Sequence, residues 1–127
     1  MRGFNDVLLR TMAMVAASDG RLTDPEMASV RTVYEKMTGE SVDEAAVLDH
    51  LRQAIIAGPD LRGFLKRHGA ELGPTERPRL IEGVVASASA DGRLDRWQDW
   101  LLDEVAEPLG VSHDEVHALV RAHDVRA

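Results

Sequence analysis

The residues best suited to chemistry in this sequence belong to a four-residue motif that occurs twice. Asp-Gly-Arg-Leu stands at positions 19–22 and again at positions 91–94. Each copy follows a stretch of small and apolar residues that is typical of a helix, so Asp19 and Asp91 fall at expected helix C-termini. A carboxylate there costs about 0.3–1 kcal/mol because it opposes the helix dipole. A bound cation would offset this cost, and so would amides at the start of the next helix.

The alternative interpretation of the motif is a purely structural corner between two helices, without a ligand. Gly20 and Gly92 are expected to end their helices with a positive φ, which glycine adopts at little cost. The side chains of Leu22 and Leu94 would pack into the core and so anchor each corner. The motif alone therefore predicts either a cation site or a helix–corner–helix unit.

Helical periodicity dominates the rest of the chain, and no segment has the pattern of a strand. Apolar residues recur at three- and four-residue intervals between breaks at Gly and Pro. Capping-box spacing marks four helix starts, at Thr23 with Glu26, Ser41 with Glu44, Asp95 with Gln98, and Ser112 with Glu115. These features predict an all-α bundle of about seven helices, with short connections that favour antiparallel neighbours.

The order of the predicted elements repeats within one domain spanning residues 1–127. The two units cover about residues 4–56 and 75–123, and a short helix near residues 61–69 connects them. Small residues gather at positions 13–18 and 84–90. These stretches predict that the first and fifth helices approach closely at the centre of the bundle, near a pseudo-two-fold axis.

Composition and net charge argue against several classes of function. The formal net charge is −7, which argues against nucleic-acid binding and permits cations as ligands. Cysteine is absent, so disulfides and thiolate zinc sites are excluded. No uncharged run is long enough to span a bilayer, and a cytoplasmic protein is the default expectation. No spacing suggests a nucleophile with its base, so no catalytic residues are predicted and a non-enzymatic protein is expected.

An EF-hand calcium loop shares part of the motif. Glu26 stands six residues after Gly20, as in the second half of such a loop. The first two ligand positions would fall on Val15 and Ala17, which cannot bind calcium through their side chains. The segment is also helical where an EF-hand needs a loop, so an EF-hand is rejected.

The doubled motif resembles the tellurite-resistance TerB family. The resemblance rests on an Ala-rich helix, then Ala/Ser-Asp-Gly-x-hydrophobic, then a polar helix start, present twice over about residues 4–123. The same fold occurs in the N-terminal part of the co-chaperone DjlA. No J-domain follows here, so the chaperone role is not implied.

The resemblance implies an all-helical, metal-binding module with a role in stress response at the inner face of the membrane. Carried onto this sequence, it marks Asp19, Glu26 and Asp91 as ligands of a divalent cation. Gln98 stands where the pattern expects Glu, which weakens the second copy. Oxygen ligands of this kind favour calcium or magnesium. The alternative is a metal-free helical scaffold that binds a protein partner.

Two weaker patterns, a histidine pair and a basic stretch, are expected to lie on solvent-exposed faces. His113 and His117 have the i, i+4 spacing of a zinc-binding pair. Residues 62–79 form the one locally basic stretch, which would suit an acidic partner or anionic lipid headgroups in a peripheral membrane contact. Its basic residues are Arg62, Lys66, Arg67, Arg77 and Arg79.

Overall fold

The computed structural model describes residues 3–16, 23–57, 60–90 and 102–123. Its elements are α1 (Phe4–Ala16), α2 (Asp24–Thr38), α3 (Glu44–Ala57), α4 (Leu61–Gly69), α5 (Glu76–Ala90), the π-helical turn η1 (Leu102–Ala106), α7 (Glu107–Leu109) and α8 (His113–His123). Within these ranges the structure contains no strand, which confirms the predicted all-α class.

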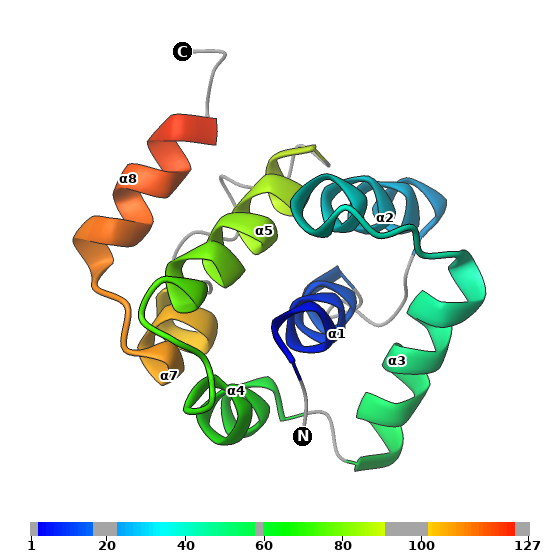
Figure 1. Cartoon of the computed structure of the whole chain (residues 1–127), viewed down its shortest axis with the longest axis horizontal. Coiled ribbons are helices and arrows are strands. Elements are labelled where there is room, and N and C mark those ends of the chain that lie inside the picture. The colour runs from blue at the N-terminus through cyan, green and yellow to red at the C-terminus, as the bar shows by residue number, and fades with distance from the viewer. Residues whose placement is uncertain (1–2, 17–22, 58–59, 91–101, 124–127) are drawn as a thin grey trace.

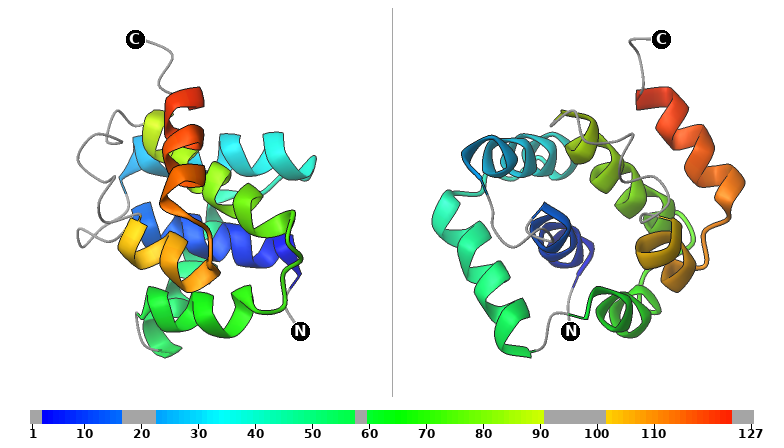
Figure 2. Two further views of the ribbon diagram at one scale, coloured as in Figure 1. Left: turned by 90° about the vertical axis from the view of Figure 1, so that its left-hand side faces the viewer. Right: turned by 180° about the vertical axis from the view of Figure 1, so that it is seen from behind.

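Helix α1 occupies the centre of the bundle. It packs against α2, α3, α4 and α5, which surround it in the front view and again from behind (Figures 1 and 2). Every residue from Val7 to Ala13 is buried, so this helix is covered on all sides rather than along one stripe. The nearly uncharged sequence of α1 follows from this position, because a helix buried on all sides tolerates few charged residues.

The expected close approach of the first and fifth helices is confirmed at Gly83 on α5. A Cβ atom built there would lie 2.7 Å from Cδ1 of Leu8 on α1. It would also lie 2.9 Å from Sδ of Met37 on α2. Glycine therefore lets three helices meet at this point, where any side chain would force its neighbours to move.

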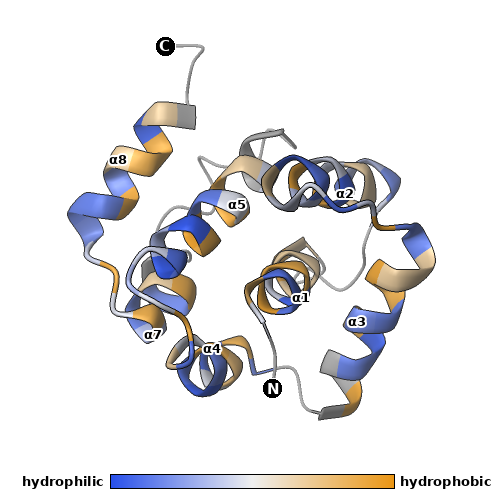
Figure 3. Cartoon of the chain, in the orientation of Figure 1, coloured by the Kyte–Doolittle hydropathy of each residue, from blue (hydrophilic) through white to orange (hydrophobic). Residues whose placement is uncertain are grey.

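The outer helices are amphipathic, with hydrophobic and hydrophilic residues alternating around each (Figure 3). On α4, Phe64 and Leu65 are buried, whereas Lys66 and Arg67 are exposed. Helix α8 runs beside α5 in the side view of Figure 2, and the two helices are in contact. Among the described residues, no helix combines the length and the apolar composition that a membrane crossing requires.

Among the described residues most of the predicted helix ends agree with the structure and one predicted cap is wrong, whereas the predicted cap at Asp95 with Gln98 lies outside the described residues. Gly39 and Gly110 end α2 and α7 with φ of 75° and 72°. The predicted cap at Ser41 is replaced by Asp43, whose Oδ1 accepts a hydrogen bond of 2.8 Å from the Ala46 amide. Aspartate caps a helix as well as serine does, so α3 begins two residues later than the Ser41 spacing predicts.

Candidate functional site

One of the three predicted metal ligands, Glu26, lies among the described residues. The other two ligands and the four predicted corner residues lie outside the described ranges, namely Asp19, Asp91, Gly20, Gly92, Leu22 and Leu94. The metal set, the positive φ of the two glycines and the likeness of the two corners therefore stay predictions. Of the predicted site residues, the structure therefore describes Glu26 alone.

Glu26 belongs to a complete capping box at the start of α2. Thr23, the N-cap residue, has extended backbone, and its Oγ1 accepts a hydrogen bond of 3.3 Å from the Glu26 amide. In return, Oε1 of Glu26 accepts hydrogen bonds from the Thr23 amide at 2.9 Å and from Thr23 Oγ1 at 3.0 Å. The sequence prediction of this capping box is confirmed.

This geometry fixes a negative charge in a defined position beside the first corner. The Glu26 residue is 5% exposed, although glutamate is seldom buried in proteins. Its charge lies at the positive end of the α2 dipole, and its Oε1 accepts both hydrogen bonds from Thr23. Donated hydrogen bonds favour the ionised form of a carboxyl group. An oriented, ionised carboxylate is the kind of ligand that a hard cation requires.

Thr23→Ala should lower the free energy of unfolding by about 1 kcal/mol, because the Glu26 amide loses its acceptor. Urea denaturation measures this change. Thr32→Ala is the matched control, since Thr32 is an exposed threonine in the interior of α2. Equal losses in the two variants would show that the capping box contributes nothing of its own.

The two weaker patterns have the character expected of solvated faces. Within the described ranges, no three His, Asp or Glu side chains come together as a metal site. His113 and His117 are both exposed on α8, as a solvated pair should be. The zinc interpretation of these histidines gains no support from their surroundings.

Some side chains of the basic stretch at residues 62–79 form contacts within the molecule. Arg62 donates a hydrogen bond of 2.6 Å to Oε1 of Glu107 and another to the carbonyl of Asp103. The bond to Arg62 lowers the pKa of Glu107 and raises the pKa of Arg62. Arg79 donates to the Met37 carbonyl at 3.1 Å. The side chains of Arg62 and Glu107 are 32% and 61% exposed, so solvent screens this ion pair and it stabilises the fold only slightly.

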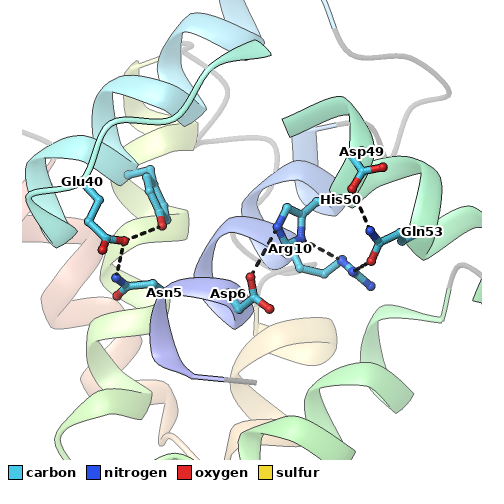
Figure 4. A network of polar contacts seen from close by, with 8 residues as sticks. Asn5, Asp6, Arg10, Glu40, Asp49, His50 and Gln53 are labelled. Atoms are coloured by element: carbon cyan, nitrogen blue, oxygen red, sulfur yellow. Dashed lines mark hydrogen bonds and ion pairs between the residues drawn. The ribbon is translucent and has the colours of Figure 1, made fainter. Parts of the chain in front are cut away.

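A polar seam between α1 and α3 is the feature that sequence reasoning missed (Figure 4). Arg10 on α1 is 3% exposed, and its Nε donates to Nδ1 of His50 on α3 at 3.3 Å. Its Nη2 donates to Oε1 of Gln53 at 2.8 Å, and Gln53 donates to Asp49 at 2.7 Å. Nε2 of His50 lies 3.4 Å from Oδ1 of Asp6. One sequence signal marks the seam, because Arg10 is the sole charged residue between positions 7 and 18.

A second polar contact ties the start of α1 to the chain after α2, also visible in Figure 4. Oε1 of Glu40 accepts hydrogen bonds from Nδ2 of Asn5 at 2.9 Å and from the Tyr34 hydroxyl at 3.3 Å. Burial, followed by the nearby charge of Glu40, raises the pKa of Tyr34. The hydroxyl therefore stays protonated and keeps donating to Glu40 throughout the physiological range.

Comparison with known proteins identifies the family of the chain. A family model described as "Tellurite resistance protein TerB" matches residues 5–121. No curated protein matches the chain, and neither does any solved structure. The matched region runs from the first residues of α1 to the last turn of α8 and covers nearly the whole chain. This chain therefore belongs to the TerB family.

Proposed function

We propose that this chain is a non-enzymatic TerB module that binds a divalent cation in a stress response of the tellurite type. The ligands are Asp19, Glu26 and Asp91, and the cation is calcium or magnesium, because all three ligands supply oxygens. The observation that carries this proposal is the buried, oriented carboxylate of Glu26, seven residues after Asp19.

Three further observations support the cation. The Asp-Gly-Arg-Leu motif is present twice, so each copy brings an aspartate to an expected helix C-terminus. The net charge of −7 favours cations over anions as ligands. Membership of a family described by tellurite resistance supports the stress role. We propose that the chain acts in the cytoplasm or at the inner face of the membrane.

The alternative is a metal-free scaffold that binds a protein partner through its helices. Two exposed apolar side chains on α3 favour it, Leu48 at 43% and Ile56 at 78% exposed. They stand eight residues apart and thus on one face of the helix. Isolated apolar residues are common on protein surfaces, so this observation is weaker than the buried carboxylate.

Glu26→Gln separates the ligand role of Glu26 from its capping role. Glutamine completes a capping box as glutamate does, so stability without metal should change little. The charged ligand is lost, so the stabilisation by about 10 mM calcium should fall. For a site with millimolar affinity that stabilisation is about 1–2 kcal/mol, or a few degrees in Tm.

Asp19→Asn and Asp91→Asn should weaken the calcium response in the same way. Asp114→Asn is the matched control, because Asp114 is an exposed aspartate on α8 outside the motif. Thr23→Ala completes the set, since it should lower stability while keeping the response to calcium. A calcium response that survives in Asp19→Asn, Glu26→Gln and Asp91→Asn alike would refute these ligands.

A further inference from the structure

The seam between α1 and α3 contains a histidine whose protonation state is fixed by its neighbours. Arginine only donates hydrogen bonds, so Nδ1 of His50 must accept the bond from Arg10 through its lone pair. The ring proton then resides on Nε2, which faces Asp6 at 3.4 Å. The observed contacts therefore require a neutral imidazole with its proton on Nε2.

A second proton on His50 would bind to Nδ1 and break this arrangement. The bond from Arg10 would lose its acceptor, and two positive groups would face each other at the same 3.3 Å separation. Asp6 would attract the imidazolium, but its side chain is 48% exposed and solvent screens its charge. Arg10 is 3% exposed, so its repulsion is screened less. Repulsion therefore outweighs attraction.

Charged groups on four helices lie near this seam. On α1 they are Asp6 and Arg10, and on α3 Asp49 accepts a bond from Gln53. On α2, Arg31 and Glu35 contact the backbone of Val42, ahead of α3. On α4, Phe64 lies against Arg10, and His68 stacks on Phe64 next to Glu71.

Helix α3 meets α1 through this seam as well as through apolar side chains such as Val47. Among its described side chains only Val47 is fully buried, whereas α1 and α5 contribute most of the fully buried residues. The contact between α1 and α3 therefore includes the polar side chains of Arg10, His50 and Gln53. Elements with few buried apolar contacts open at a lower free energy than the core.

We propose that the His50–Arg10 contact is an acid-sensitive latch that releases α3 from α1 when His50 takes up a proton. An unperturbed histidine gains this proton near pH 6.5. His50 excludes the second proton while α3 is packed on α1 and accepts it when α3 is released. The packed state is therefore favoured at neutral pH and becomes less stable as the pH falls through this value. Acidification thereby uncovers the α3-facing side of α1 while the apolar α1–α2–α5 core persists.

Amide hydrogen exchange tests the latch directly on the whole chain. Between about pH 7.5 and 5.5, protection of α3 should fall about tenfold relative to α5, after correction for intrinsic exchange rates. His50→Gln should remove this difference, because glutamine can accept from Arg10 and donate to Asp6 without titrating. His68→Gln, which removes the histidine that packs against Phe64, should keep it.

Two outcomes would overturn the latch. One is equal protection of α3 at both pH values in the wild type. The other is a pH dependence that persists in His50→Gln or disappears in His68→Gln. Nitrogen-15 NMR of the imidazoles gives a readout that needs no variant. At neutral pH, His50 should carry its proton on Nε2 with Nδ1 bare, and a proton on Nδ1 would contradict the proposal.

Discussion

Leu8→Ala should lower the free energy of unfolding by about 3 kcal/mol, the largest loss expected from a single truncation in this protein. Leu8 is fully buried in the middle of α1 and lies against α5 at Gly83. The shorter side chain loses its transfer free energy and leaves a cavity between central helices. Chemical denaturation measures the change.

Leu48→Ala is the matched control for this prediction. Leu48 is 43% exposed on α3, so truncation there should cost less than about 1 kcal/mol. A loss at Leu8 no greater than at Leu48 would contradict the placement of α1 at the centre of the core.

Gly83→Leu should destabilise the protein by a similar amount, about 3 kcal/mol, for the opposite reason. Here the side chain is too large, because a Cβ alone would lie 2.7 Å from Leu8 and 2.9 Å from Met37. Gly83→Ala should cost much less, because the contacting atoms are the ends of flexible side chains and alanine favours the helix.

The control for Gly83 is Gly3→Leu. A Cβ at Gly3 meets no atom within 4 Å, so this change should be nearly neutral in thermal or chemical denaturation. If Gly83→Leu were as well tolerated as Gly3→Leu, the close packing of α1, α2 and α5 would be wrong.

Local patterns in the sequence predicted the helices well. Periodic apolar residues and glycine stops located α2, α4 and α8, and the capping box at Thr23 is confirmed. The close approach of α1 and α5 was predicted correctly, but it occurs at Leu8 and Gly83, outside the small-residue stretches at 13–18 and 84–90 on which the prediction rested. These features depend on residues near each other in the chain or on one helix face.

Features that depend on distant residues were not predicted. The seam joins Arg10 to residues 40 or more positions away, and periodicity contains no information about such pairings. The π-helical turn at Leu102–Ala106 follows the predicted helix start at Asp95, and the sequence did not distinguish it from α-helix because an i→i+5 turn leaves no apolar pattern of its own. At the candidate site, sequence predicted the Glu26 cap but could not show how deeply its carboxylate is buried.

The most direct test of the proposed cation site is calorimetric titration of the wild-type chain with calcium, and then with magnesium. The proposed site predicts a saturable heat signal in the millimolar range or tighter, accompanied by a rise in Tm of a few degrees. Both effects should shrink in Asp19→Asn and stay unchanged in Asp114→Asn. No heat and no stabilisation at millimolar concentrations of either ion would contradict the cation site and leave the metal-free scaffold as the function.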